Sequence, residues 1–198
     1  MNTNISERVA AWYEAEYKNK SLSRYSTFLK ALKTVYSFNK EPVIVETGCI
    51  RQLDDYGAGY STKIFAECVR EFGGSLYSID NNADNIRLSK KITSQILPKL
   101  NYLLGDSIEI LKKFDKKIDL LYLDSMDCPI EGDASKSQIH NLNEYFSAKD
   151  KLRENCVILI DDVGFSNGGK GLITNEFLKT ENYQCLEKLQ QIVWAKKV

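Results

Sequence analysis

Five short apolar runs recur between residues 43 and 160, and the segments between them carry apolar residues at helical spacing. The runs are Val43–Val45, Leu76–Ile79, Tyr102–Leu104, Ile118–Leu123 and Cys156–Ile160. Strands and helices that alternate in this way predict a parallel sheet with helices on both faces. Runs of consecutive apolar residues are typical of strands that are buried on both faces, which agrees with such a sheet.

The chain on either side of this alternation completes the expected fold. Residues 1–40 predict two amphipathic helices, because their apolar residues form two stripes at helical spacing. Near the other end, residues 183–189 and 192–195 predict a closing pair of antiparallel strands at the sheet edge. We expect a single α/β domain whose Rossmann-like, doubly wound core, residues 43–198, holds a mostly parallel seven-stranded sheet with an antiparallel C-terminal strand.

Charge and cysteine content narrow the classes of function. Lys plus Arg and Asp plus Glu number 27 each, so no net charge attracts nucleic acid or an anionic membrane. The five cysteines are widely spaced and include no Cys-x-x-Cys pair, which argues against a disulfide framework or a zinc site. No apolar run approaches the roughly 20 residues that span a bilayer. We expect a cytoplasmic protein without a nucleic-acid or membrane partner; its oligomeric state stays open, a homo-oligomer included.

Two of the apolar runs end in carboxylates. Asp124 follows the run at 118–123, and Asp161 and Asp162 follow the run at 156–160. Parallel strands end at the same edge of a sheet, so neighbouring strands would bring the three acids together there. Acids that close repel one another unless a cation such as Mg²⁺ or Ca²⁺, or a buried basic group, neutralises them. A turn or helix cap is the alternative role for any one of them.

A glycine-punctuated turn follows the first strand and opens the next helix. Its candidate residues are Glu46, Gly48, Gly57, Gly59, Ser61 and Thr62. Glycine lets a ligand approach the backbone, and Ser61 or Thr62 can cap the helix whose amino end faces the site. A flexible loop without a ligand explains the same glycines equally well.

The second and third strands each end in an acid. Asp80 lies roughly twenty residues after the glycines, where doubly wound folds place an acid for ribose hydroxyls. Asp106 and Ser107 follow Gly105, and an acid and a hydroxyl there can border an adenine ring. Either acid can instead cap the helix that follows it. The third glycine of the dinucleotide fingerprint is missing, which weakens the prediction of NAD as the cofactor.

Taken in order along residues 43–162, these motifs resemble class I S-adenosylmethionine-dependent methyltransferases. The resemblance is closest to metal-dependent O-methyltransferases of the catechol, caffeoyl-CoA, cephalosporin-hydroxylase and macrocin types. In these enzymes an acid ends the fourth strand and an acidic pair, or Asp-Asn, ends the fifth. The resemblance implies that S-adenosylmethionine and Mg²⁺, or another divalent cation, serve to methylate a hydroxyl of a small molecule or of a sugar or glycan.

The same resemblance implies a role for each motif residue. The implied metal ligands are Asp124, Asp161 and Asp162. The implied cofactor-binding residues are Glu46, Gly48, Gly57, Gly59, Ser61, Thr62, Asp80, Asp106, Ser107 and Asp124. The sequence departs from the family in two places, because an insert at 49–56 lengthens the glycine loop and Asp127 replaces the lysine that catechol enzymes place after the first metal ligand.

The general base stays open between Asp127 and His140. Asp127 would accept a proton if desolvation raised its pKa, whereas the simpler interpretation is a solvated loop acid. His140 is the single histidine and titrates in the useful range, but it lies beside the apolar stripe of its predicted helix. Lys170, in a glycine-rich loop, suits a substrate lid or an anionic group, and equally an ordinary loop. Rival functions are a metal-independent methyltransferase acting on nitrogen or carbon, and a cofactor-binding subunit without activity.

Overall fold

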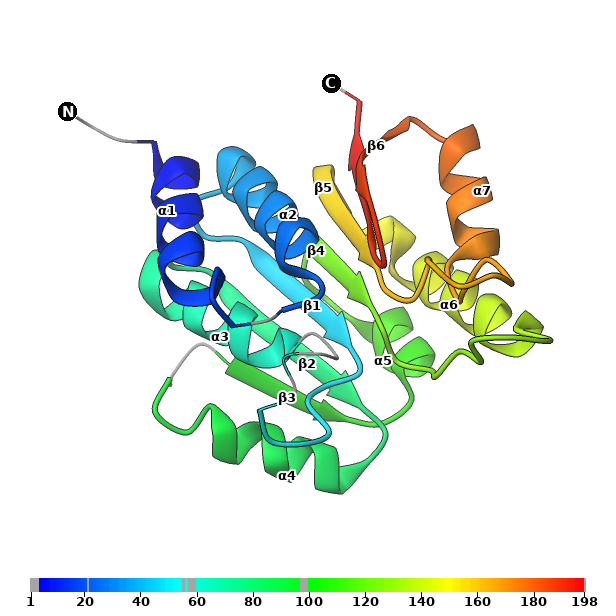
Figure 1. Ribbon diagram of the computed structural model, residues 1–198, viewed down its shortest axis with the longest axis horizontal. Coiled ribbons are helices and arrows are strands. Elements are labelled where there is room, and N and C mark those ends of the chain that lie inside the picture. Colours follow the sequence, from blue (N-terminus) through cyan, green and yellow to red (C-terminus); the bar gives the residue numbers. More distant parts are fainter. Residues whose placement is uncertain (1–3, 21, 55, 57–59, 97–99, 198) are drawn as a thin grey trace.

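A seven-stranded sheet forms the centre of the protein, which we describe from a computed structural model over residues 4–20, 22–54, 56, 60–96 and 100–197 (Figure 1). The strands are β1 (Val43–Thr47), β2 (Ser75–Asp80), β3 (Leu100–Leu104), β4 (Ile118–Leu123), β5 (Leu152–Ile160), β6 (Tyr183–Lys188) and β7 (Ile192–Lys196). Their order is β3-β2-β1-β4-β5-β7-β6. Strand β7 runs antiparallel to both of its neighbours, and the other strands are parallel. The predicted Rossmann-like sheet with an antiparallel C-terminal strand is therefore confirmed.

Helices cover both faces of this sheet. They are α1 (Ile5–Tyr17), α2 (Tyr25–Phe38), α3 (Ser61–Phe72), α4 (Ala83–Ile92), α5 (Ser107–Lys113), α6 (Ser135–Ala148), a 3-10 turn (Lys149–Lys151) and α7 (Leu172–Thr180). Contacts group α1 to α4 on one face and α5 to α7 on the other. Helix α7 was not predicted, because the short segment follows a glycine-rich loop that favoured an irregular connection.

Alternation along the central strands explains the two layers. In β4, Leu120 and Tyr122 lie in the core beneath α2 and α3, whereas Leu121 and Leu123 lie in the core beneath α5 to α7. All four side chains are fully buried. Burying an apolar side chain of this size stabilises a fold by about 1.5–3 kcal/mol, so the apolar run fixes β4 in the middle of the sheet.

The parallel register places the functional edge. Thr47 of β1 lies opposite Leu123 of β4, and Leu123 lies opposite Ile160 of β5. The backbone N–H of Asp124 then donates to the Thr47 carbonyl at 3.0 Å, and that of Asp161 donates to the Leu123 carbonyl at 3.2 Å. The residues that follow these three strands therefore meet at one edge.

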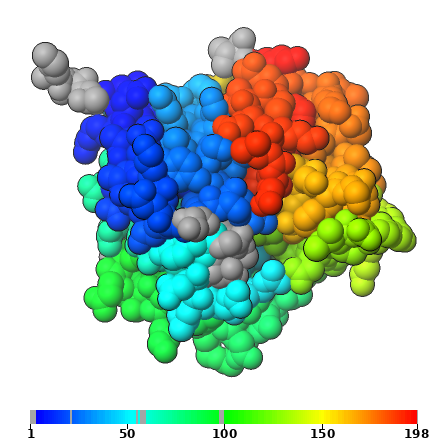
Figure 2. Space-filling view, in the orientation of Figure 1, coloured from blue at the N-terminus to red at the C-terminus, as the bar shows by residue number. Residues whose placement is uncertain are grey.

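The two ends of the chain share one side of the molecule. Figure 2 shows the N-terminal helices, in blue, beside the C-terminal strands, in red, and α2 contacts both β6 and β7. This arrangement brings the loop between α1 and α2 close to the end of β5. Among the helices of the described segments, none is long and apolar enough to cross a membrane.

Candidate functional site

Two adjoining cavities lie at the carboxyl edge of the sheet. The first, of about 290 Å³, is lined by the glycine turn after β1 together with Asp80, Asp124 and Asp127. The second, of about 220 Å³, is lined by Asp80, Asp106, Ser107 and His140, among others. Gly48, Asp80, Asn81, Ser125 and Asp127 line both cavities. Most of the described residues predicted to bind a cofactor thus line two cavities that share part of their walls, whereas Glu46 and Thr62 line neither.

Asp80 holds the loops that form the wall between the two cavities. Its Oδ2 atom accepts from the backbone N–H of Cys49 at 3.1 Å, and its Oδ1 atom accepts from that of Asn82 at 2.7 Å. The Asn85 amide also donates to both oxygens. Asn82, not Asp80, caps α4. The Cys49 thiol lies 3.4 Å from Oδ2 as well, so the Asp80 carboxylate is fixed in position by contacts to both of its oxygens.

The turn after β1 requires glycine at position 48. Gly48 has a φ of +81°, and a Cβ atom there would lie 2.5 Å from the carbonyl oxygen of Asp124. That separation is far below normal van der Waals contact, so any side chain would push the β1 and β4 ends apart. Because these ends line the first cavity, Gly48 sets its shape.

Glu46 precedes this turn and is completely buried. The Ser78 hydroxyl donates to its Oε1 atom at 2.7 Å, while Oε2 has no hydrogen-bond partner among the described residues. Burial raises the pKa of Glu46 to about 7. A buried carboxylate oxygen without a partner costs free energy. The ammonium group of an amino-acid moiety would satisfy it, so this observation fits the methionine part of S-adenosylmethionine.

The predicted helix cap at Ser61 or Thr62 is wrong. Helix α3 begins at Ser61, and its N-cap is Tyr60, which adopts a left-handed conformation with a φ of +48°. The Thr62 hydroxyl instead accepts from the backbone N–H of Ile50 at 3.2 Å, which fixes the inserted loop. Ser61 lines the first cavity. The predicted cofactor residues Gly57 and Gly59 lie outside the described residues.

The second cavity collects the residues predicted for the adenine. Asp106 caps α5 by accepting from the backbone N–H of Glu109 at 3.0 Å, so its alternative role as a helix cap is confirmed. His140 lies here as well, with its Nε2 atom 2.9 Å from the Ser125 hydroxyl and 3.4 Å from the Ser107 hydroxyl. A hydrogen bond with Glu144 raises the pKa of His140. These contacts place the candidate base beside the cofactor residues.

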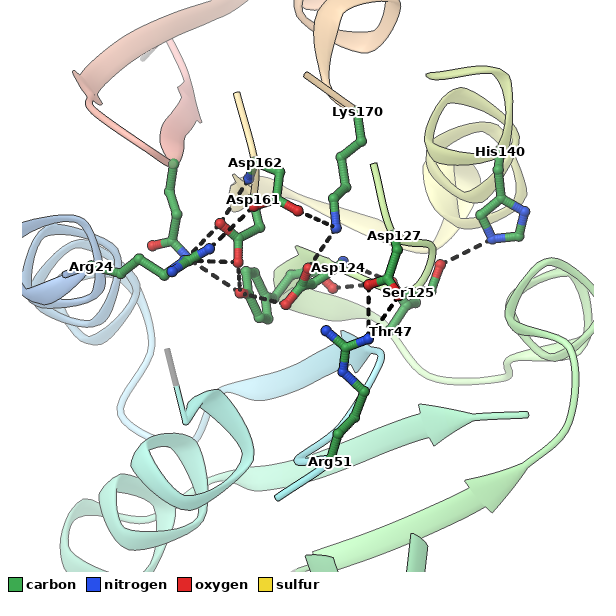
Figure 3. A network of polar contacts seen from close by, with 12 residues as sticks. Arg24, Thr47, Arg51, Asp124, Ser125, Asp127, His140, Asp161, Asp162 and Lys170 are labelled. Carbon is green, nitrogen blue, oxygen red and sulfur yellow. Dashed lines mark hydrogen bonds and ion pairs between the residues drawn. The ribbon is translucent and has the colours of Figure 1, made fainter. Parts of the chain in front are cut away.

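Asp127, the other candidate base, faces solvent. Its carboxylate pairs with the Arg51 guanidinium at 2.8 Å, and the Asp127 side chain is 79% exposed. Both residues line the first cavity, and Figure 3 shows the Arg51 side chain reaching the Asp127 carboxylate. The exposure and the ion pair agree with the simpler interpretation of Asp127 as a solvated loop acid. Its catalytic role stays a prediction.

The three acids at the ends of β4 and β5 do meet, as predicted. They lie between two cationic side chains, Arg24 and Lys170 (Figure 3). The Lys170 ammonium lies 2.6 Å from Oδ1 of Asp124 and 3.1 Å from Oδ2 of Asp162. The Arg24 guanidinium contacts both oxygens of Asp161, at 2.8 and 2.9 Å, and Oδ1 of Asp162 at 3.2 Å. Asp161 and Lys170 are buried.

Tyr122 ties the carboxylates together from below. Its hydroxyl contacts Asp161 Oδ2 at 2.8 Å and Asp124 Oδ2 at 3.0 Å. The Gln191 amide donates to the same hydroxyl at 3.1 Å and, through its own oxygen, accepts from Thr27 of α2 at 2.6 Å. The cluster is thus a hydrogen-bonded network that joins β4, the end of β5, the turn before β7 and α2.

The charges explain the protonation of this network. Burial alone lowers the pKa of Lys170, but the carboxylates of Asp124, Asp162 and Asp161 raise it above its usual range. Arg24 behaves in the same way beside Asp161. Burial and the charge of Asp124 raise the pKa of Asp161 to about 7. Both cations therefore stay charged at neutral pH, whereas the carboxyl group of Asp161 titrates near neutral pH.

The predicted metal ligands do not fit a divalent cation in this arrangement. Within the described segments, no three or more His, Cys, Asp or Glu side chains are placed to hold a metal ion. Mg²⁺ and Ca²⁺ bind carboxylate oxygens directly and leave no room for an ammonium between them. Here the oxygens of Asp124 and Asp162 that face one another contact Lys170 instead.

Sequence reasoning missed Arg24 and misplaced Lys170. Arg24 lies between the first two helices and belongs to no motif. No sequence signal therefore linked it to Asp161, which it contacts across 137 positions of the chain. Lys170 was expected in a substrate lid or an ordinary loop, whereas its side chain is 3% exposed and contacts the strand-end acids. The glycines around Lys170 were the available signal, because they permit the sharp turn that buries it.

Comparisons with known proteins agree with this fold. The model of a methyltransferase domain family matches residues 55–163 of the chain. The search of curated proteins found no match to the chain. Similar solved structures include a candidate caffeoyl-CoA O-methyltransferase from Staphylococcus aureus, 16% identical, with a TM-score of 0.63 over 97% of this chain and 99% of that chain.

Two further solved structures illustrate the range of these relatives. A Podospora anserina methyltransferase with bound S-adenosylhomocysteine is 16% identical, with a TM-score of 0.60 over 99% of this chain and 88% of that chain. A candidate rRNA methylase from Clostridium thermocellum is 16% identical, with a TM-score of 0.58 over 82% of this chain and 92% of that chain. At such identities the likeness shows the fold alone.

Proposed function

The chain belongs to this methyltransferase domain family and is a class I S-adenosylmethionine-dependent methyltransferase, and on that premise we propose that it methylates a hydroxyl oxygen of a small molecule or sugar. The observation that carries the proposal is the position of Asp124. Its side chain is 25% exposed, lines the first cavity and is held from behind by Lys170 and Tyr122. A fixed carboxylate at this position can receive the hydrogen of an acceptor hydroxyl.

The geometry of Asp124 suits this task because methyl transfer is an in-line displacement. The acceptor oxygen must point a lone pair at the methyl carbon, and its O–H must point elsewhere. An ionised carboxylate offers about four lone-pair positions, and Lys170 and Tyr122 each use one of those on Asp124. The positions that face the cavity remain for the acceptor.

The proposed cofactor would bind along the two cavities. Asp80 would accept hydrogen bonds from the ribose hydroxyls, Asp106 and Ser107 would border the adenine, and Glu46 would meet the ammonium group. When bound, S-adenosylmethionine supplies an electrophilic methyl group. No divalent cation takes part in the proposed transfer, because Lys170 and Arg24 occupy the contacts that the predicted Mg²⁺ would need.

The acceptor class rests on charge and on the resemblance to O-methyltransferases. The chain has 27 acidic and 27 basic residues, and phosphate backbones bind to basic surfaces. This balance favours a small, uncharged acceptor over a nucleic acid. A sugar or glycan hydroxyl is the proposed choice among small acceptors.

A second candidate function keeps the cofactor and changes the acceptor atom to nitrogen. The excess of acids over cations around Asp124 favours it, because three carboxylates face two cations and an amine would find a negative environment. An amine must lose a proton before it can attack the methyl group. Asp124 lines the first cavity and would receive that proton.

Two measurements test the proposed function. Calorimetric titration with S-adenosylhomocysteine is expected to show one site per chain, and NAD is expected to show none. Carbon-13 methyl-labelled S-adenosylmethionine is then incubated with pools of sugars, phenols, amines and rRNA, and the methyl signal of each product identifies the accepting atom. Methoxy products support the proposal, whereas N-methyl products select the second candidate. Cofactor binding without transfer to any pool would leave a binding subunit.

A further inference from the structure

The contacts of Lys170 contradict the metal site that the sequence predicted. Its ammonium lies between Asp124 and Asp162, within 3.1 Å of both. Arg24 closes the other side of the cluster through Asp161 and Asp162. Each acid that the resemblance assigns to a divalent cation is therefore already paired with a cationic side chain. The carboxylate oxygens that the resemblance assigns to a metal ion are thus the same oxygens that contact Lys170 and Arg24.

The loop that delivers Lys170 is built for this position. After β5 the chain turns back on itself, and the backbone N–H of Lys170 donates to the Asp162 carbonyl at 3.1 Å. A Cβ atom at Gly169 would lie only 1.6 Å from that carbonyl oxygen, and Gly169 has a φ of +65°. Gln138 of α6 donates to the Gly169 carbonyl at 3.1 Å. The loop is thus anchored at both the strand and the helix.

The number of positive charges agrees with the replacement of a divalent cation by Lys170 and Arg24. Lys170 and Arg24 supply two positive charges, which is the charge of one Mg²⁺ or Ca²⁺ ion, and they face the same three carboxylates. Burying carboxylates without a cation would be strongly unfavourable. An arginine adds a planar pair of donors, which suits the two oxygens of Asp161.

We propose that Lys170 and Arg24 take the place of the divalent cation in this enzyme, so that the acids at the ends of β4 and β5 form a closed ion-pair cluster instead of a metal site. Lys170 is then a positioning residue, because it holds Asp124 toward the first cavity without lining that cavity itself. The kinetic part of this proposal rests on the proposed methyl transfer, whereas the metal-binding part does not.

Removal of the lysine ammonium provides the test. Purified wild-type protein, Lys170→Ala, Lys170→Arg and the control Lys179→Ala are titrated with Mn²⁺ and followed by electron paramagnetic resonance, without cofactor or acceptor. Lys179 is a suitable control because it follows the same loop, on α7, and forms an exposed pair with Glu176. Wild type, Lys170→Arg and Lys179→Ala are expected to show only weak, nonspecific binding. Lys170→Ala is expected to bind one Mn²⁺ at least ~10-fold more tightly.

Several results would overturn the proposal. One Mn²⁺ bound per wild-type chain, and lost in Asp124→Asn, would show that a metal displaces Lys170. A folded Lys170→Ala variant that gains no Mn²⁺ affinity would show that the ammonium does not occupy a metal position. If that variant does not fold, the wild-type titration decides alone. Titration with S-adenosylhomocysteine separately tests the proposed function, so the failure of one is distinguishable from the failure of the other.

Once an acceptor is known, the kinetic consequence can be measured. Wild-type turnover is expected to be unchanged by a chelator and by added Mg²⁺. Lys170→Arg is expected to keep part of the turnover, because it restores a cation on the acids, whereas Lys170→Ala is expected to lose turnover that Mn²⁺ restores in part. Wild-type turnover that a chelator abolishes and Mg²⁺ restores would contradict the replacement.

Discussion

The ammonium nitrogen of Lys170 lies 2.6 Å from Oδ1 of Asp124, although 46 positions separate the two residues in the chain. Asp124 ends β4, and Lys170 ends the loop that returns from β5. Their contact therefore joins the strand whose end lines the first cavity to a loop for which the sequence predicted a lid or an ordinary connection. Substitutions that break the contact between Lys170 and Asp124 should therefore change the stability of the protein.

Replacing Lys170 with methionine should destabilise the protein strongly. The side chain is 3% exposed, and its loss removes the ammonium that pairs with Asp124 and Asp162, two carboxylates that are only partly exposed. Breaking a buried ion pair by removing one member costs about 3–5 kcal/mol. Urea unfolding at pH 7.5 measures the change. The matched variant Lys179→Met removes an exposed pair and should change the free energy of unfolding by no more than about 1 kcal/mol.

Gly169 and Gly132 offer a matched pair of glycine-to-alanine substitutions. Both have positive φ values, but a Cβ atom at Gly169 would lie 1.6 Å from the Asp162 carbonyl oxygen, while nothing lies within 4 Å at Gly132. Gly132→Ala should cost about 1–2 kcal/mol, for the left-handed backbone alone. Gly169→Ala should cost clearly more in the same unfolding assay, because the loop must move. Equal losses would contradict the described turn.

Glu46→Gln should remove the contribution of Glu46 to the pH dependence of stability. The folded-state pKa of Glu46 is about 7, against 4.5 for the free group, so the native state binds the extra proton between these values. The stability of the wild type should therefore fall relative to Glu46→Gln as the pH rises from 4.5 to 7, and the difference should stay constant above that range. The full difference is about 3 kcal/mol. Unfolding curves without cofactor at pH 4 and pH 8 measure it, and parallel curves would refute it.

Asp80→Ala should weaken cofactor binding. The carboxylate is buried at the wall of both cavities and holds the Cys49 and Asn82 backbone N–H groups. Loss of charged hydrogen bonds of this kind costs about 1.5–3 kcal/mol, which corresponds to a 10- to 100-fold weaker affinity for S-adenosylhomocysteine. Calorimetry provides the dissociation constant. Asp84→Ala, on the exposed side of α4, is the control and should bind as the wild type does.

His140→Ala distinguishes a cofactor role from a base role. The imidazole contacts Ser107 and Ser125 in the second cavity, so its loss should weaken the binding of S-adenosylhomocysteine several-fold. Turnover at saturating cofactor should change little. A loss of about 100-fold or more in kcat with unchanged cofactor binding would instead assign His140 as the general base. Asp127→Ala, measured in parallel, applies the same criterion to the other candidate.

The sequence predicted the fold because local patterns determine the elements. The apolar run before Asp124 fits only a strand that is buried on both faces, and parallel strands deliver their following residues to one edge. For that reason the meeting of Asp124, Asp161 and Asp162 followed from the sequence, as did the grouping of Asp80 with Asp106. Helix α7 escaped because nine residues after a glycine loop carry too little periodicity to distinguish a helix from a turn.

The partner of the three acids was decided only by the tertiary structure. Sequence reasoning required a cation among them and left a metal ion and a buried basic group as alternatives. Lys170 and Arg24 reach the cluster from a reversing loop and from the connection between α1 and α2. The glycines beside Lys170 permit its turn but do not specify where its side chain ends, and Arg24 belongs to no local pattern. The requirement for charge balance is local chemistry, which the sequence contains, whereas the identity of the balancing charge depends on which distant side chains the packed sheet brings within reach.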